Sequence, residues 1–346
     1  MHPLKAHRLK FPASILNLRG AVLTAGAIAL LAAPCVSRAA DLASATDALL
    51  NGNSNAAVAQ LKQVLSTDPS NGQAHLLLCR AYYAQSLATP AASECTAALR
   101  TLTNDSTAQD WAGRAYGMQA NSAGPIAGLR LAFKVRNAFE AAVRLNPLNG
   151  DAVNDLSEYY IDAPSIVGGG FEKAALLADR SAAELPQNAH RTRAMSAEKQ
   201  KDYTTAEREF RAATAVANKP NAWADLGAFY SRRSQSDQAV EALRRAIALD
   251  PTHDATLVDA ATTLTELNRE PRLAERALRD YLASRSKSDA APAFRVHVTL
   301  AKLLRIQGNT ADAKIELGRS LDLATDYAPA RKELAALEHQ TTIAAR

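Results

Sequence analysis

Cysteine and histidine are the residue types here that are best suited to act as nucleophiles or metal ligands. The chain has three cysteines and seven histidines. No C-x-x-C pair occurs, and no cluster of histidines accompanies a cysteine. The histidines beyond residue 39 are spread over separate segments: His75, His190, His253, His297 and His339. Neither G-x-S-x-G nor H-E-x-x-H is present. We therefore predict no catalytic residue, no metal site, no cofactor and no enzymatic activity.

The run of three glycines at 168–170 is the remaining candidate for chemistry, because backbone N–H groups before a helix can hold an anion. A phosphate-binding loop needs a strand before the glycines and Lys-Ser or Lys-Thr after them. Here Phe171, Glu172 and Lys173 follow, and helical patterns flank the loop. We therefore predict a structural loop. An enzyme or small-molecule binder that uses this loop is the alternative.

The composition indicates helices as the elements that position all of these residues. Alanine and leucine dominate the apolar residues, aromatic residues make up 5%, and glycine and proline fall between periodic segments. No long alternating run of valine, isoleucine or threonine predicts a sheet. The predicted fold class is all-α.

Residues 1–39 have the three parts of an export signal. Four basic residues without an acidic one come first, an apolar stretch covers residues 21–33, and Ser37-Arg38-Ala39 offers small residues for cleavage. The apolar stretch is short for a membrane-spanning helix. We expect cleavage near Ala39 and a mature protein in the periplasm or outside the cell. An uncleaved membrane anchor is the alternative, whereas Pro34 before Cys35 disfavours lipidation.

Removal of this segment changes the charge balance of the chain. The whole chain has 40 Lys and Arg and 35 Asp and Glu, and five of the basic residues lie in residues 1–39. The mature part is therefore formally neutral, without a basic field that would attract nucleic acid. We expect no nucleic-acid partner and no stable membrane insertion after signal removal.

One stretch between Pro220 and Pro251 carries a repeat motif. Its first half has Trp223, Leu226, Gly227 and Tyr230, and its second half has Ala239, Leu243, Ala246 and Pro251. This spacing resembles the W-x2-L-G-x2-Y … A-x3-F … A … P pattern of the tetratricopeptide repeat family. The resemblance implies a helix pair whose small residues lie where the helices approach most closely. Such a pair must stack on neighbouring pairs to bury its apolar face.

Extending this register in both directions predicts the domain organisation. Residues 40–327 form a right-handed α-α superhelical solenoid of about eight helix pairs, with insertions near 121–131 and 161–171, and residues 328–346 form a C-terminal capping helix and tail. In the third repeat we place the first helix around Trp111 and Ala115. The sequence W-A-G-R-A-Y-G at 111–117 and Y-Y-x2-A-P-x-I-V-G-G-G from Tyr159 resemble a mostly uncharacterised subgroup of exported bacterial proteins of this family.

The family resemblance also implies where a partner binds, because first helices line the concave face of tetratricopeptide solenoids. By register, the candidate binding residues are Arg80, Tyr83, Tyr116, Asn154, Asp155, Glu158, Asp225, Asp259, Lys302 and Arg305, with Asp162 and Arg295 nearby. The face is then acidic in its middle and basic at its C-terminal end. This favours a protein or peptide partner with a basic centre, and ordinary solvated faces are the alternative.

Two expectations follow from these placements. The chain is an exported scaffold or adaptor that acts in the assembly of an envelope or secretion complex, with a membrane-tethered assembly factor as the alternative. In the second repeat, Cys79 takes the small-residue position and Cys95 a large apolar position on facing helices. A disulfide between them and two buried free thiols are both open.

Overall fold

The structure is a computed structural model that describes residues 33–344. The chain divides into two units, residues 1–39 and residues 40–346. The predicted signal peptide lies outside the described residues except for its last seven positions, so export and cleavage stay predictions. Everything below concerns the second unit.

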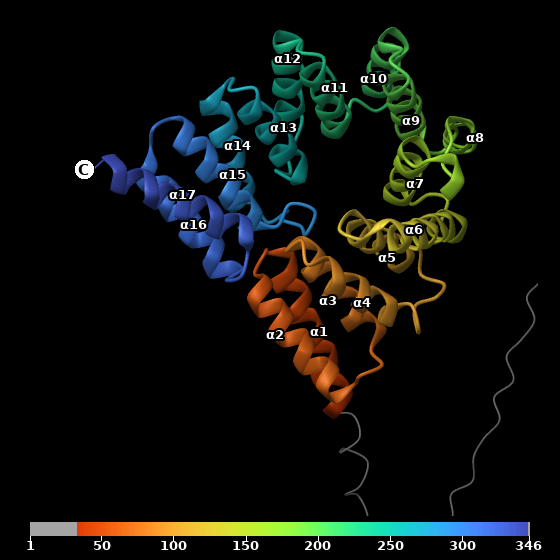
Figure 1. Cartoon of the computed structure of the whole chain (residues 1–346), viewed down its shortest axis with the longest axis vertical. Helices are drawn as coiled ribbons and strands as arrows, with labels where there is room; N and C mark the ends of the chain where they lie inside the picture. Colours follow the sequence, from red (N-terminus) through yellow and green to blue (C-terminus); the bar gives the residue numbers. More distant parts are fainter. Residues whose placement is uncertain (1–32, 345–346) are drawn as a thin grey trace, which may run out of the picture. The chain divides into compact units, whose positions relative to one another are not determined.

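The described residues form α-helices that follow one another in pairs, without a strand (Figure 1). The pairs are α1 (Ala33–Leu50) with α2 (Ser54–Thr67), α3 (Gly72–Ala84) with α4 (Ala88–Ala98), α5 (Ser106–Asn121) with α6 (Pro125–Leu145), α7 (Gly150–Asp162) with α8 (Phe171–Ser181), α9 (Pro186–Lys199) with α10 (Tyr203–Ala217), α11 (Pro220–Arg232) with α12 (Ser236–Ala248), α13 (Ala255–Glu266) with α14 (Pro271–Ala283), and α15 (Ala293–Ile306) with α16 (Thr310–Leu323). A last helix, α17 (Ala328–Ala344), follows them. These eight pairs and the final helix confirm the expected all-α superhelical repeat fold.

Short polar side chains begin many of these helices. Asn53, Asn71, Asp105 and Asn149 each accept a hydrogen bond from a backbone N–H group in the first turn of the helix that follows. Such caps satisfy donors that have no partner within the helix. Proline begins other helices, as at Pro220 of α11, where a missing N–H group costs nothing.

In the third and sixth repeats a glycine of the first helix lies very close to a large residue of the second helix, and we call this the crossing contact. A Cβ atom on Gly227 of α11 would lie 2.7 Å from Cδ2 of Leu243 on α12. In the third repeat, a Cβ atom on Gly113 would lie 2.4 Å from Cε1 of Phe139. Only glycine permits this helix separation, because heavier side chains would overlap with the partner.

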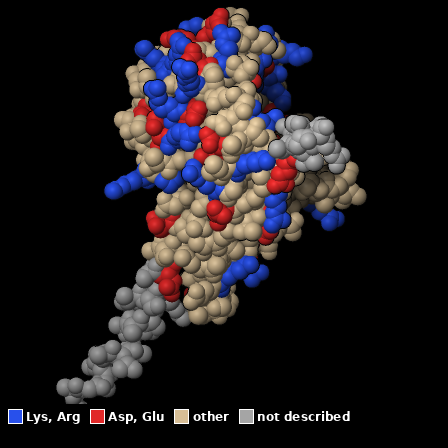
Figure 2. All heavy atoms as spheres, turned by 90° about the vertical axis from the view of Figure 1, so that its left-hand side faces the viewer, with Lys and Arg blue, Asp and Glu red and all other residues tan. Residues whose placement is uncertain are grey.

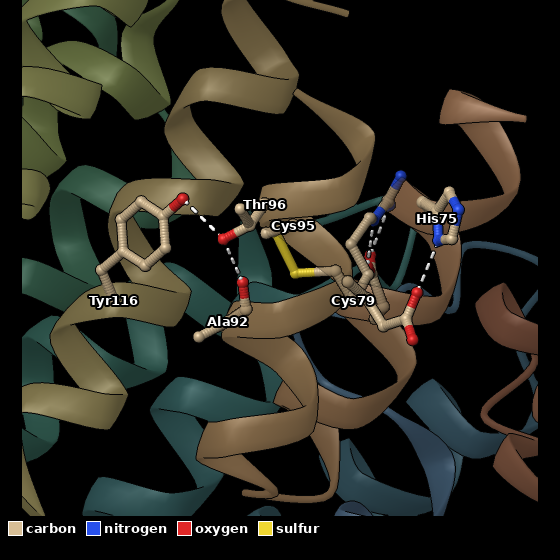
Figure 3. Close-up of a disulfide and its surroundings, with 9 residues drawn as sticks. His75, Cys79, Ala92, Cys95, Thr96 and Tyr116 are labelled. Carbon is tan, nitrogen blue, oxygen red and sulfur yellow. Dashed lines mark hydrogen bonds and ion pairs between the residues drawn. A yellow bond between two sulfur atoms is a disulfide. The ribbon is translucent and has the colours of Figure 1, made fainter. Parts of the chain in front are cut away.

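In the second repeat a disulfide takes the place of the crossing contact. Cys79 on α3 and Cys95 on α4 form a disulfide, and both are fully buried (Figure 3). They are 16 positions apart in the sequence, which is also the separation of Gly227 and Leu243. The same helix pair carries a hydrogen-bonded pair of His75 Nδ1 and Glu94 Oε2 at 2.6 Å. The second repeat is thus linked covalently where its neighbours are linked by packing alone.

The first insertion differs from the lengthened turn that we expected at 121–131. The turn comprises only residues 122–124, and α6 continues for 21 residues from Pro125 to Leu145. The added residues therefore extend a helix, because Pro125 at its start and the apolar residues that follow are compatible with helical structure.

The second insertion is a closed loop that contains a short 3-10 helix, η1 (Ser165–Val167). The backbone N–H groups of Gly168, Gly169 and Gly170 donate to the carbonyls of Ser165, Pro164 and Tyr160, at 2.9, 3.2 and 2.7 Å respectively. A Cβ atom on Gly169 would lie 1.8 Å from the carbonyl oxygen of Ala163. The three N–H groups are already used, so the loop does not form an anion cradle.

Residues far apart in sequence also meet, since the first two repeats contact the last ones. Asn55 of α2 donates to the Thr325 hydroxyl at 2.8 Å and accepts from the Thr325 backbone at 3.1 Å. Arg80 of α3 donates two hydrogen bonds to Asp289, in the segment before α15, at 2.6 and 2.9 Å. These contacts connect the two ends of the repeat series.

Replacement of Gly227 by leucine should lower the free energy of unfolding by more than about 1 kcal/mol, because the new side chain overlaps with Leu243. Gly318→Leu on α16 is the matched control, since a Cβ atom there meets nothing within 4 Å. Chemical denaturation of both variants measures the difference. Equal stability of Gly227→Leu and the wild type would contradict the crossing contact.

The disulfide predicts that the folded protein, analysed by mass spectrometry without reductant, is about 2 Da lighter than the same protein after denaturation and reduction. The bond should contribute roughly 3 kcal/mol to stability in the chain-entropy model, given the short loop that it closes. Alkylation after denaturation, without reductant, provides the control, because both cysteines are buried in the folded protein. Labelling of both Cys79 and Cys95 in the unreduced protein would show free thiols instead.

Candidate functional site

Three hollows follow one another along the first helices of the repeats, and together we call them the inner groove. They lie against α3, α5 and α7, against α7, α9 and α11, and against α11, α13 and α15, with volumes of about 520, 500 and 540 Å³. Asp162 lines the first and the second hollow, and Arg232 lines the second and the third. The shared residues show that the three hollows are neighbours along the first helices.

Half of the candidate binding residues line this groove. Tyr83, Asp155 and Glu158 line the first hollow, Asp225 lines the second and Asp259 the third. These side chains line the groove because the helical period places them on the face of each first helix that is turned toward it. Asn154 lies beside them on α7, where its side-chain oxygen accepts a hydrogen bond from Asn188 at 3.0 Å.

Arg114 organises the charges of the first hollow. Its guanidinium donates to Asp155 and lies 3.0 Å from a carboxylate oxygen of Asp110. It also stacks over the ring of Trp111 at 4.8 Å. Burial raises the pKa of Asp110 to about 7, with repulsion from Asp155 adding to the shift and Arg114 opposing it. Two carboxylates therefore share one cation in a nearly dry place.

Arg191 has the same role in the second hollow. It donates to Glu158 of α7 at 2.7 Å and to Asp225 of α11 at 3.2 Å, so one side chain of α9 links three successive repeats. Burial raises the pKa of Asp225, and Arg191 opposes this shift. Because the guanidinium is planar and always charged, it can hold both carboxylates in a fixed geometry.

Asp259 in the third hollow has a different environment. Its side chain is exposed, and among the described residues no cation forms an ion pair with it. Burial by the surrounding wall nevertheless raises the pKa of Asp259 to about 6, with repulsion from Asp225 and Asp254 adding and Arg295 opposing. Asp259 thus combines a raised pKa with the lack of an ion pair among the described residues.

Four candidate residues do not line these three hollows. Tyr116 is buried between helices, with its hydroxyl 2.9 Å from that of Thr96 (Figure 3). Arg80 is bound to Asp289. Lys302 and Arg305 lie 3.7 and 3.9 Å from the carboxylate of Glu333 on α17. The expected basic C-terminal end of the groove is thus partly neutralised by the last helix.

The two arginines that organise the groove were not among the residues predicted by register. Arg80 and Glu158 each come directly after the small residue at the helix crossing of their repeat, which is Cys79 or Ser157. Arg114 comes directly after Gly113 in the same way, so alignment of the third repeat on Gly113 would have identified it. Arg191 belongs to a repeat whose motif is degenerate, with His190 at the position of Trp223. The same register applied to that repeat would have found it.

Elsewhere the charges are mixed, and Figure 2 shows basic and acidic side chains interspersed over one face of the molecule. Within residues 33–344 no group of three or more potential ligand side chains is arranged to hold a metal ion. In the same part of the chain, no helix has the length and apolar character needed to cross a bilayer.

Asp110 predicts a pH dependence of stability. Its pKa in the folded protein is about 7, against an ordinary value of 3.8, so the folded protein retains a proton that the unfolded chain releases. The stabilisation is complete below about pH 4 and is lost as the pH rises through about 7. Asp110→Asn should therefore raise the free energy of unfolding at about pH 8 by more than about 1 kcal/mol, and much less at about pH 5.

Denaturation at both pH values measures this effect, with Asp280→Asn on α14 as the control. A gain that is the same at both pH values would contradict the raised pKa of Asp110.

The sequence matches two family models. One is described as a tetratricopeptide repeat and matches residues 42–107. The other is the middle TPR-like domain of cilia and flagella-associated protein 70 and matches residues 190–321. No curated protein sequence matches the chain.

Solved structures with a similar arrangement share little sequence with this chain. Yeast Tom70 is 15% identical with a TM-score of 0.51, and the match covers 84% of this chain and 61% of that one. A tetratricopeptide repeat protein from Parabacteroides merdae is 15% identical, with a TM-score of 0.44 and coverage of 78% and 99%. A thermophilic TPR protein from Thermus thermophilus is 16% identical, with a TM-score of 0.43 and coverage of 66% and 98%.

Folds of this kind serve as scaffolds for protein–protein interaction. Taken together, the repeat motif, the helix pairs and the two family matches show that this chain is a tetratricopeptide repeat protein.

Proposed function

We propose that this protein is a scaffold that binds an extended segment of a protein or peptide in the inner groove. The observation that carries the proposal is the succession of three neighbouring hollows, which share Asp162 and Arg232 as lining residues. A chain in extended conformation can follow such a surface across several repeats. Specificity then comes from the side chains that it places opposite each hollow.

The charges of the groove support a partner with basic side chains. Asp259 is exposed without an ion pair among the described residues, and Asp162 is 60% exposed beside Lys199. A lysine or arginine of the partner would lower the cost of charging Asp259 in its crowded surroundings.

The ion pairs around Arg114 and Arg191 prepare the groove for binding. They cross from one repeat to the next, so the groove residues already have defined positions before a partner arrives. A preorganised surface loses less conformational entropy on association than a flexible one.

The proposed location is the periplasm or the exterior of the cell, in the assembly of an envelope or secretion complex. Support comes from the signal-like residues 1–39, which have a basic start, an apolar stretch and small residues for cleavage. A membrane-tethered assembly factor is the alternative, and retention of residues 1–39 would favour it.

The test is affinity capture from periplasmic extract with wild type, an inner-groove variant and a control. The inner-groove variant is Asp162→Lys/Asp259→Lys, which reverses two exposed charges and leaves the ion pairs of Arg114 and Arg191 unchanged. The control is Glu184→Lys/Glu241→Lys, which reverses two exposed charges away from the three hollows. Proteins retained by wild type and control, and at least about tenfold less by the groove variant, would be groove partners.

Equal retention by all three baits, or no retained protein with the wild type, would contradict binding in the inner groove. Sequencing of the amino terminus of the bait tests export in the same sample. A terminus near Ala40 is expected, and an intact segment 1–39 would identify the tethered form.

A further inference from the structure

A fourth hollow lies away from the inner groove, between α6, α7 and α8, and has a volume of about 580 Å³. Its walls are mainly apolar. The apolar lining residues are Val143, Pro147, Val153, Leu156, Tyr160, Leu176 and Leu177. The members on α7 are Val153, Leu156 and Tyr160, and they occupy a different face of that helix from Asn154, Asp155 and Glu158. This hollow is therefore separate from the proposed peptide site.

Two positions that hold large side chains in the sixth repeat hold smaller ones in the fourth. Val153 stands at the position of Trp223, four residues before the small crossing residue. Ala178 stands at the position of Leu243, which forms the crossing contact in the sixth repeat. Val153 lines the hollow, whereas Ala178 is fully buried and does not line it.

The rim of the hollow is basic. Arg144, Lys173 and Arg180 line it together with a single carboxylate, Glu140. Glu140 already accepts a hydrogen bond from the Tyr160 hydroxyl at 3.0 Å, and Lys173 donates to the Gly168 carbonyl at 2.8 Å. Among the described residues, no carboxylate forms an ion pair with Arg144 or Arg180.

We propose that this hollow binds a single-chain amphipathic carboxylate, with its apolar chain between α6, α7 and α8 and its head group at Arg144 and Arg180. The volume is within the range of small-molecule sites, and the lining combines apolar walls with a few charged groups. Guanidinium groups suit a carboxylate because they can donate two parallel hydrogen bonds to it.

Titration calorimetry with decanoate tests this proposal, and decylammonium is the matched ligand with the same chain and the opposite charge. The wild type should bind decanoate at least about tenfold more tightly than decylammonium. Arg144→Gln/Arg180→Gln should lower the affinity for decanoate by about tenfold or more. Arg272→Gln/Arg276→Gln, on the exposed face of α14, should leave it unchanged.

A second variant tests the apolar part of the site. Val143→Phe adds a ring to the wall of the hollow and should abolish decanoate binding, while circular dichroism confirms that the protein is folded. Equal affinity of the wild type for the two amphiphiles, or no binding of either, would overturn the proposal. So would unchanged decanoate binding by the double arginine variant, whose substitutions lie at exposed positions and leave the core intact.

Discussion

The structure depends on how closely the two helices of each repeat approach. The same place in the helix pair is occupied by three kinds of contact: Gly227 against Leu243, Gly113 against Phe139, and the disulfide of Cys79 and Cys95. A small residue on one helix is needed in each case, because a larger one would separate the helices. The approach distance then determines which side chains of neighbouring repeats can meet, and thus the groove and its charges.

The ion pairs of the groove are a consequence of this stacking. Arg191 reaches Glu158 and Asp225 only because successive first helices lie side by side at a regular spacing. Between α6, α7 and α8 the same architecture leaves a hollow with mainly apolar walls. The stacked helix pairs therefore carry a charged surface on their first helices and, separate from it, an apolar hollow.

The register around Gly227 was sufficient to predict the helix pairs, since the apolar and small positions recur with the repeat. It failed at Tyr116, because the third repeat was aligned on Ala115 and the crossing residue is Gly113. An error of two positions turns a helical side chain by about 200°, from a groove to a core. The pairing of Arg80 with Asp289 depends on where the whole superhelix brings its ends, and local spacing does not contain that information.

The contacts between the first and last repeats change how this array should respond to local opening. In a linear array each repeat interacts only with its neighbours, so terminal repeats fray independently. Here the opening of either end would also leave Asp289, whose side chain is 7% exposed, without Arg80, and would separate Asn55 from Thr325. Opening of the first repeats and opening of the last repeats are thus coupled, unlike in a linear array.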